Sequence, residues 1–342
     1  MFIYACSLYP LVDCVLKQRD DLNSFNMPGF RPPSLRARGV NSATPVTRNT
    51  VAARAGVSTA VVSYVLNNGP RPVAAETRDK VLRAIAEMGY RPNTVARALR
   101  SRRTMTLGLL VPDSSNPYFA ELAKALEDSA FDKGYALLMA NSSNDAEREL
   151  SQLRALVARQ VDGLLVVRTG ATGSLQAEVP EDTPLVLLDR AIDRDVFSSV
   201  TADNFGGARA GVEHLISHGH HRIGCISGPA DLPAARDRER GWAAALSDAK
   251  LQADEELVFR SPFSREGGYF AAQSLLALSS RPTAVFASSD LQAVGALRAC
   301  HEAGLRIPED IAVVSFDGTL ESEFTWPPLT VVQQSIYALA QL

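Results

Sequence analysis

The residues from Thr47 to Asn67 constrain the fold of this chain more than any other stretch. They read TRNTVAARAGVSTAVVSYVLN. Small apolar residues share one helical face before Gly56, which permits a tight turn, and Ser58 can cap a second helix with its own apolar stripe. This layout predicts a helix-turn-helix, a motif whose second helix enters a DNA groove. An ordinary pair of packed helices in a globular core is the alternative interpretation.

The second helix of this motif carries small and polar residues beside its apolar stripe. Thr59, Ala60, Ser63 and Tyr64 are therefore free to face a DNA groove. A third helix is expected at 75–88, with apolar residues at helical spacing on its inner face. Three helices would make a small bundle.

Charge is distributed unevenly along the sequence. The formal net charge is -3, yet from Val46 to Arg103 basic residues outnumber acidic ones by eleven to three. A basic head on an acidic remainder is what phosphate binding requires, because cations displace the counterions that condense on DNA. A solvated arginine-rich surface is the alternative.

Length and residue usage limit the class of protein. A chain of 342 residues suggests two or three domains. No apolar run reaches about 18 residues, so we expect no contact with a membrane. The four cysteines are scattered and form no C-x-x-C pair, for which a reduced cytoplasm is the simplest setting.

The body of the chain alternates buried strands with amphipathic helices from Thr106 onward. Continuous apolar runs between helices predict parallel sheets covered on both faces. The pattern falls into two units, which predicts two lobes with a ligand between them at the carboxyl ends of the strands. Strands are expected at 106–111, 135–140, 163–167, 185–189, 222–227, 256–261, 283–288 and 311–316. Helices are expected at 117–132, 145–159, 204–218, 236–249, 265–278 and 290–303.

Six motifs follow one another along the chain: VAARAGVSTAVVSYVLN, GYRPNTVARALRS, LGLLVPDSSNPYFAEL, VDGLLV, HGHHRIG and PEDIAVVSFD. Their order and spacing resemble the LacI/GalR family of transcription regulators from about Val46 to the end. The resemblance implies a small all-α helix-turn-helix head joined by a hinge helix to a bilobed α/β body. The two lobes would be parallel-sheet and Rossmann-like, similar to periplasmic binding proteins. It also implies a homodimer, most simply a repressor, that binds a pseudo-palindromic operator in double-stranded DNA and responds to a small effector.

The expected domains combine this resemblance with the patterns above. We expect a DNA-binding domain at 46–91, a hinge helix and linker at 92–105, a first lobe at 106–203, a second lobe at 204–318 and a crossover back to the first lobe at 319–342. Residues 1–45 would be a disordered extension or precede a later start codon, such as Met27. The family usually continues beyond PPLTVVQQ, so we expect the crossover to be truncated.

The resemblance also assigns residues that contact DNA. The base-reading positions of the second helix fall on Thr59, Ala60 and Tyr64. The phosphate-positioning places fall on Thr47, Ser58, Ser63 and Asn67. The hinge positions fall on Asn93, Ala96 and Leu99, with Leu99 as an apolar wedge in the minor groove. Tyr64 stands where the family often has an arginine, so a hydroxyl or ring contact would replace a bidentate contact with guanine.

A second group of residues matches the family's effector pocket, on both lobes and at the crossover. These residues are Asp113, Tyr118, Phe119, Asp189, Arg190, Arg238, Phe263, Asp290, Asp317 and Gln334. Aromatic rings with converging carboxylates and an arginine suit a sugar, whose hydroxyls both donate and accept hydrogen bonds. Nucleobases remain possible. For each charged residue taken singly, a salt bridge or a helix cap is the alternative.

Other kinds of chemistry are weaker interpretations of the sequence. His214 and His218 share a helix face, but the segment around them is better interpreted as a helix end, a glycine cap and the start of a strand, so we expect no metal. No phosphate-binding loop or nucleophile elbow is present, so we expect neither a cofactor nor an enzyme. Two alternatives stay open: a periplasmic-type sugar-binding protein, and an α/β enzyme with an accessory DNA-binding head.

Overall fold

The computed structural model describes residues 46–67, 69, 71–91, 98, 101, 103–169, 175–190 and 197–342. The chain divides into two compact units, residues 1–92 and 93–342, called the head and the body below. Within the part of the chain that the structure describes, no helix is long and apolar enough to cross a membrane.

The head contains α2 (Arg48–Ala55), α3 (Thr59–Asn67) and α4 (Ala75–Met88). A reciprocal capping box starts α2: the Thr47 hydroxyl accepts from the Thr50 N–H, and the Thr50 hydroxyl accepts from the Thr47 N–H. Gly56 ends α2 with a φ of 67°, a left-handed conformation that favours glycine. The Ser58 hydroxyl accepts from the Val61 N–H at 3.4 Å and so caps α3.

Apolar side chains from all three helices form the small core of the head. Its buried members are Val51, Ala52, Val62, Val65, Val81 and Ala84. Alanines at two of these positions let the helices approach closely. The fold of the head therefore depends on few, short side chains, and each buried methyl group carries a large share of its stability.

The described residues of the body form two sheets of five strands each, and all paired strands among them run parallel. The first sheet has the order β2-β1-β3-β4-β5 and the second the order β10-β9-β8-β6-β7. The strands of the first lobe are β1 (Thr106–Val111), β2 (Ala136–Asn141), β3 (Gly163–Val166), β4 (Leu185–Leu188) and β5 (Ser198–Val200). Those of the second lobe are β6 (Ile223–Ser227), β7 (Val258–Arg260), β8 (Ala284–Ala287), β9 (Ala312–Asp317) and β10 (Thr330–Gln333).

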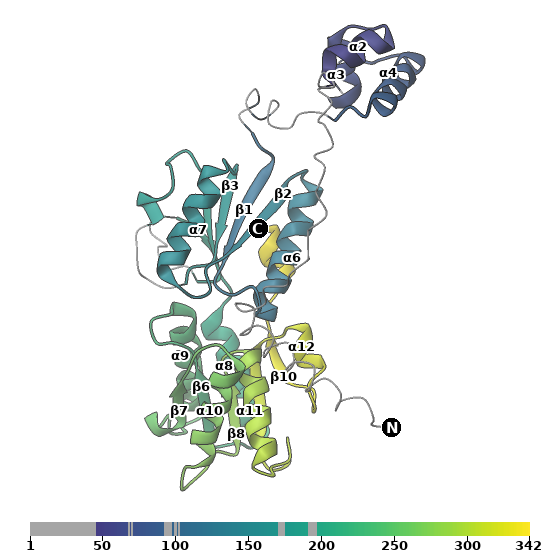
Figure 1. The fold of residues 1–342 in the computed structure, drawn as a ribbon. Coiled ribbons are helices and arrows are strands. Elements are labelled where there is room, and N and C mark those ends of the chain that lie inside the picture. The colour runs from purple at the N-terminus through teal and green to yellow at the C-terminus, as the bar shows by residue number, and fades with distance from the viewer. Residues whose placement is uncertain are drawn as a thin grey trace, which may run out of the picture. The chain divides into compact units, whose positions relative to one another are not determined.

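Helices cover both faces of each sheet (Figure 1). They are α6 (Pro117–Asp132), α7 (Ala146–Ala158), α8 (Asn204–Ser217), α9 (Pro233–Asp248), α10 (Arg265–Leu276), α11 (Asp290–Glu302), α12 (Leu320–Glu323) and α13 (Ile336–Gln341), with short 3-10 turns at Leu175–Ala177 and Glu255–Leu257. Successive residues of β1 point to opposite faces: Leu109 packs with α6, whereas Leu110 packs with α7. This alternation explains why β1 is an unbroken apolar run.

The predicted fold class is confirmed for the helical head and for the two parallel-sheet lobes. Two strands were not expected, the short β5 and the edge strand β10. Because β10 pairs with β9, the chain stays in the second lobe until Gln333. Only then does it return to the first lobe, where α13 packs against α6 (Figure 1). The α9 helix also begins earlier than expected, because Pro233 fits its first turn.

Candidate nucleic-acid interface and ligand cavity

The first turn of α3 forms an exposed surface of the head. Thr59 and Ala60 are exposed, while Val62 and Val65 on the opposite side are buried in the core. Ser63 and Tyr64 are half-buried at the border of the two sides. The structure thus brings the four candidate residues of α3 to one side of the helix, outside its core.

The ring of Tyr64 is held by the loop that follows α3. A Cβ atom added to Gly69 would lie 2.4 Å from the Tyr64 Cδ1 atom, and the Gly69 N–H donates to the Tyr64 carbonyl at 3.1 Å. Glycine is therefore required beside this ring. The contact fixes where the Tyr64 side chain lies on the surface.

Two of the remaining DNA-binding candidates have structural roles as well. Thr47 and Ser58 cap α2 and α3, and both stay exposed. The side chain of Asn67 and all of Asn93, Ala96 and Leu99 lie outside the described residues, so the predicted hinge helix stays a prediction.

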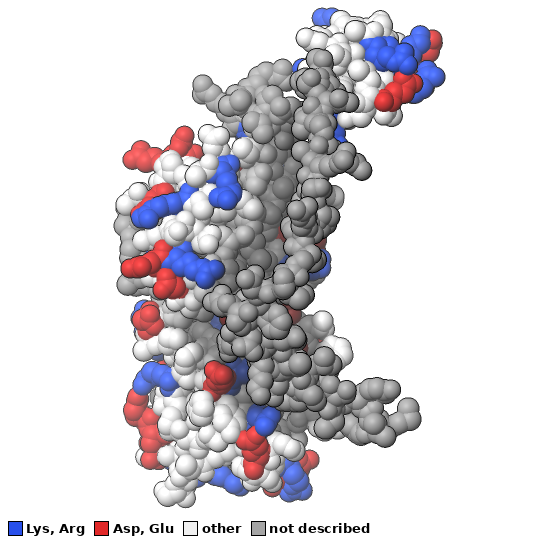
Figure 2. Space-filling model, viewed as in Figure 1, with Lys and Arg blue, Asp and Glu red and all other residues white. Residues whose placement is uncertain are grey.

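Some basic side chains of the head form ion pairs with acidic side chains of the head. Arg54 pairs with Glu87 at 2.7 Å and Lys80 with Glu76 at 2.8 Å, both on exposed side chains. Figure 2 shows acidic side chains next to basic ones on the visible face of the head. Because the head has few acidic residues, a surplus of arginine remains after this pairing.

A cavity of about 300 Å³ lies between the two lobes of the body. Its walls are Asp113, Asn116, Phe119, Asn144, Thr169 and Arg190 from the first lobe and Pro229, Asp231, Leu232, Pro262, Phe263 and Ser264 from the second. Asp113, Thr169 and Arg190 each follow the carboxyl end of a strand of the first sheet. This is where open parallel sheets usually bind ligands.

Arg190 lies between two phenylalanine rings of this cavity. Its guanidinium carbon is 5.5 Å from the ring centre of Phe119 and 6.0 Å from that of Phe263, one ring from each lobe. Arg190 also donates to the Arg168 carbonyl at 3.4 Å. Burial lowers the pKa of Arg190, an effect that the neighbouring Asp189 carboxylate opposes.

A buried network beside the cavity joins the lobes through the crossover. The Tyr118 hydroxyl lies 3.3 Å from Asp189 Oδ1 and 3.2 Å from Gln334 Oε1. Gln334 in turn donates to Asp317 Oδ1 at 2.8 Å, and Arg238 approaches the same oxygen at 3.3 Å. Because Tyr118 is in the first lobe and Asp317 in the second, Gln334 links two elements that could otherwise move apart.

Asp317 is a strongly perturbed group of this network. Burial raises the pKa of its carboxyl to about 7, although the positive charge of Arg238 acts in the opposite direction. Its φ of 120° is rare for a residue with a side chain. Strained backbone of this kind often occurs at functional sites.

Asp290 does not line the cavity, and its carboxylate accepts three hydrogen bonds within the second lobe. Its carboxylate accepts from the Ser315 hydroxyl at 2.6 Å and from the Thr319 N–H and hydroxyl, both at 2.7 Å. These bonds tie α11 to the end of β9. Of the other candidates, Asp113, Phe119, Arg190 and Phe263 line the cavity, and Tyr118, Asp189, Arg238, Asp317 and Gln334 lie in or next to the network.

Several cavity residues were missed in the sequence. The polar ones are Asn116, Asn144, Thr169, Asp231 and Ser264. Asn116 and Ser264 are the N-caps of α6 and α10, each accepting a backbone N–H. In the sequence, both residues stand at a helix start that follows a strand. This position predicts an N-cap and gives no reason to expect a contact with a ligand.

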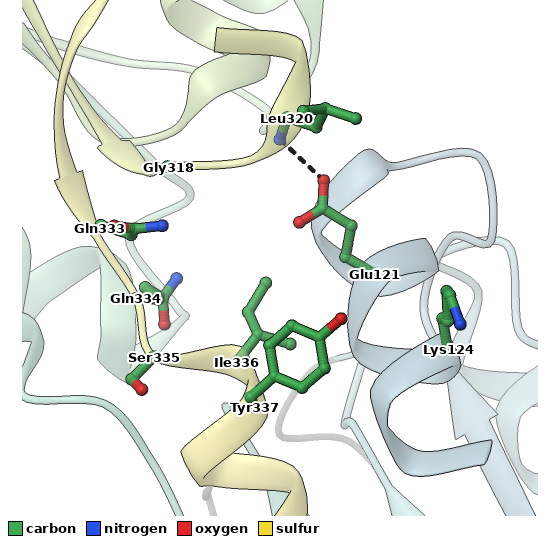
Figure 3. A pocket seen from close by; sticks show the side chains of 9 residues that line it. All are labelled: Glu121, Lys124, Gly318, Leu320, Gln333, Gln334, Ser335, Ile336 and Tyr337. Atoms are coloured by element: carbon green, nitrogen blue, oxygen red, sulfur yellow. Dashed lines mark hydrogen bonds between the residues drawn. The ribbon is translucent and has the colours of Figure 1, made fainter. Parts of the chain in front are cut away.

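A second cavity, of about 480 Å³, lies between α6 and the crossover (Figure 3). Glu121 reaches across it and accepts from the Leu320 N–H at 2.9 Å, and Lys124 on its rim pairs with Asp128. It has no pair of facing aromatic rings and no buried cation among its described walls. We therefore consider the smaller cavity as the effector site.

The histidines of α8 have local partners. His218 Nδ1 lies 2.9 Å from the His214 carbonyl, and the two rings are 4.4 Å apart. Across the described residues, no group of three His, Cys, Asp or Glu side chains could hold a metal ion.

Comparison with known proteins identifies both units. Residues 49–93 match the bacterial regulatory proteins of the lacI family. Residues 104–341 match the periplasmic binding proteins and sugar binding domain of the LacI family.

Individual relatives and solved structures agree with these matches. The HTH-type transcriptional repressor PurR of Erwinia tasmaniensis is 40% identical over 287 residues, covering 83% of this chain and 84% of the relative. The PurR of Proteus mirabilis is 39% identical and covers 85% of this chain and 86% of that protein. The lac repressor dimer bound to operator and an anti-inducer is 30% identical, with a TM-score of 0.75, and covers 87% and 90% of the two chains. A complex of the transcriptional regulator CelR with cellobiose is 34% identical, with a TM-score of 0.65, and covers 86% and 90%.

The helix-turn-helix head, the bilobed body with its cavity and these matches lead to one assignment. The chain belongs to the lacI family of bacterial regulatory proteins, and it is a DNA-binding transcriptional regulator that responds to a ligand.

Proposed function

We propose that this regulator is a cytoplasmic repressor that binds a pseudo-palindromic operator as a homodimer and is controlled by a sugar. The relatives named as repressors support the first part, and the lac repressor structure shows a dimer on its operator for that protein. A two-fold dimer presents two copies of α3, and a pseudo-palindrome presents two matching half-sites. The family consists of regulators, and we propose no catalytic reaction.

The cavity between the lobes is the observation that supports a sugar most directly. Its volume is near the lower end of the roughly 300–1,000 Å³ typical of small-molecule sites. Phe119 and Phe263 offer apolar faces for the ring of a sugar. Asp113, Asn144 and Asp231 offer oxygens and an amide that can bond hydroxyls. The wall thus combines flat apolar faces with dispersed donors and acceptors, as a compact polyol requires.

A nucleobase is the second candidate effector. The two phenylalanine rings belong to different lobes, so closure of the lobes could stack both on a planar ligand. The polar groups around them are spread over the wall of the cavity, which favours a ligand with hydroxyls on several sides.

Effector binding is tested by calorimetric titration of the full chain with monosaccharides and with purine bases. We expect a monosaccharide to bind, and Phe263→Ala to weaken its binding by about tenfold or more because one stacking face is lost. Phe270→Ala is the matched control, since Phe270 is an exposed phenylalanine of the same lobe. Binding of purines alone would replace the sugar by a nucleobase, and equal effects of the two variants would contradict the assigned cavity.

Operator binding is tested by selecting bound fragments from random DNA. We expect one enriched pseudo-palindrome, bound with strong dependence on salt because phosphate contacts release counterions. The bound sugar should change this affinity. Equal affinity for selected and random DNA would contradict the proposed function.

A further inference from the structure

Three charged side chains line the described walls of the effector cavity, and two of them are acidic. Asp113 belongs to the first lobe and Asp231 to the second, and the cation is Arg190. Both hydrogen bonds that Asp113 accepts, from the Ser115 N–H and hydroxyl, use its Oδ1 atom. The described part of the chain therefore leaves Asp113 Oδ2 able to accept from a ligand, and Asp231 is exposed.

Arg190 is poorly placed to bind an anion. Only 6% of the residue is exposed, and its guanidinium lies between the two phenylalanine rings. One of its nitrogens donates to the Arg168 carbonyl, and the Nε atom is 4.0 Å from Asp189 Oδ2. Arg190, the cation among the described walls, thus already lies beside a buried carboxylate of its own lobe.

Caps and a proline leave the helix starts at the cavity with fewer free N–H groups than an uncapped helix would offer. A helix N-terminus binds phosphate through free backbone N–H groups. At α6, Pro117 has no N–H, and the Asn116 side chain already accepts from the Tyr118 N–H at 3.0 Å. At α10, Ser264 accepts from the Gly267 N–H at 3.0 Å.

The start of α9 is occupied in a different way. Pro233 is its first residue and has no N–H to offer. Asp231 stands two residues earlier, so a full negative charge lies next to the partial positive charge of the helix end. An anionic ligand would meet this carboxylate at the same place.

From these observations we infer that the cavity accepts an uncharged sugar and rejects its phosphate ester, and that Asp113 and Asp231 are the residues that set this preference. The inference rests on the proposed function, because it concerns the effector of the same cavity. A phosphate carries close to two negative charges and needs several free donors. Here it would meet two carboxylates, while a hydroxyl at the same position would donate a hydrogen bond to either of them.

Matched pairs of ligands test the inference on the full chain. Calorimetric titrations compare D-ribose with D-ribose 5-phosphate, D-glucose with D-glucose 6-phosphate and D-fructose with D-fructose 6-phosphate. For each sugar that binds, we expect its ester to bind at least about tenfold more weakly at low salt, given the size of charge interactions near a protein surface. Added salt should reduce the ratio of the two affinities, since it screens the repulsion between the phosphate and the two carboxylates.

Neutral variants identify the residues responsible. Asp231→Asn and Asp113→Asn should each reduce the ratio of the sugar affinity to the ester affinity, even where they also weaken binding of the sugar itself. Asp248→Asn is the matched control. It removes the same charge from the other end of α9, roughly 22 Å away at 1.5 Å per residue, and should leave the ratio unchanged.

The outcomes separate the two levels of the proposal. An ester that binds as tightly as its sugar, or a ratio that neither cavity variant changes, would overturn the inference and leave the proposed function standing. Failure of every sugar and every ester to bind would overturn the sugar effector, and the inference with it.

Discussion

The α3 surface of the head and the cavity of the body differ in the residues that a ligand would meet: exposed residues on α3, and a buried arginine among the residues of the cavity. Thr59 and Ala60 are exposed, and the helix that carries them is held by apolar packing on its other side. In the cavity, Arg190 is almost fully buried, and its neighbours Asp189 and Arg168 are buried as well. The head offers groups that have few internal partners, whereas the body offers groups held by charged partners.

This difference predicts how each site responds to substitution. A residue at the α3 surface can change without loss of folding, because its side chain contributes little to the core. A residue of the cavity network cannot, because removing one member leaves another charge buried and unpaired. The head can therefore change its preferred DNA sequence at little cost in stability, whereas substitutions in the buried network of the body also lower the stability of the body.

The largest effect is expected for the buried pair behind the cavity wall. Arg168 and Glu149 are 2.9 Å apart, and both side chains are almost completely buried. Arg168→Ala should lower the free energy of unfolding of the body by about 3–5 kcal/mol, because the Glu149 carboxylate loses its counter-charge. Urea unfolding followed by circular dichroism measures the change.

The matched control for this prediction is Arg298→Ala on α11. Arg298 also pairs with a glutamate, at 2.5 Å, but its side chain is 71% exposed. We expect a loss of at most about 1 kcal/mol. Losses of similar size in the two variants would contradict the contrast between buried and exposed ionic groups.

An effect of comparable size at most is expected from the titration of Asp317. Its pKa is raised from 3.8 in the unfolded chain to about 7 in the folded body, so the folded state holds the proton more tightly. The stabilisation is complete below pH 4 and is lost as the pH rises to 7, by at most roughly 1.4 kcal/mol per pH unit. Asp317→Asn should remove this part of the change in unfolding free energy with pH.

The free energy of unfolding is measured against pH for the parent and for Asp317→Asn, and the two profiles are compared to separate Asp317 from groups that both proteins share. Burial also raises the pKa of Asp290, which adds a slope of the same sign, and the pKa of Asp310 is lowered to about 2, which acts at more acidic pH. The Asp310 contribution is shared by the parent and the variant, whereas the charges of Asp290 and Asp317 act on each other, so the Asp290 contribution changes together with that of Asp317. Parallel profiles between pH 4 and pH 7 would show that Asp317 does not titrate in this range.

The sequence predicted the α3 surface better than the cavity, for a physical reason. Helical spacing separates the residues that pack from those that do not, so Thr59 and Ala60 could be placed outside the core by counting. The same spacing predicted the sheets and most helix bounds in the body. It missed β5, which has only three residues, and β10, whose edge position is defined by pairing with β9.

Contacts between distant residues could not be derived in this way. The link from Tyr118 to Gln334 spans 216 positions, and no local pattern specifies it. Asp290 illustrates the same limit: helix and strand spacing gave no sign of the three hydrogen bonds that its carboxylate accepts from Ser315 and Thr319. Asp231, which lines the cavity, had no motif at all.

A moderate effect on recognition, without an effect on folding, is expected at Tyr64. Tyr64→Phe keeps the ring against Gly69 and removes the hydroxyl. If the hydroxyl contacts a base edge, discrimination at one or two operator positions should fall by about 1–3 kcal/mol. Selection of bound DNA with the variant measures this change, and thermal unfolding of the head should stay the same. An unchanged selection profile would restrict the role of Tyr64 to its ring.

The smallest effect concerns the start of α4, where the head lacks a cap. Ala74 is in the N-cap position with an extended backbone, and no side chain there accepts from the first N–H groups of the helix. Ala74→Ser supplies an acceptor for them and should stabilise the head by about 1 kcal/mol. Ala86→Ser makes the same chemical change at an exposed position inside α4, where serine should instead destabilise by roughly 0.5 kcal/mol through its lower helix propensity. Thermal unfolding of the head within the full chain should therefore shift in opposite directions for the two variants, with DNA preference unchanged in both. If Ala74→Ser gave no gain, the first N–H groups of α4 would already be satisfied by solvent.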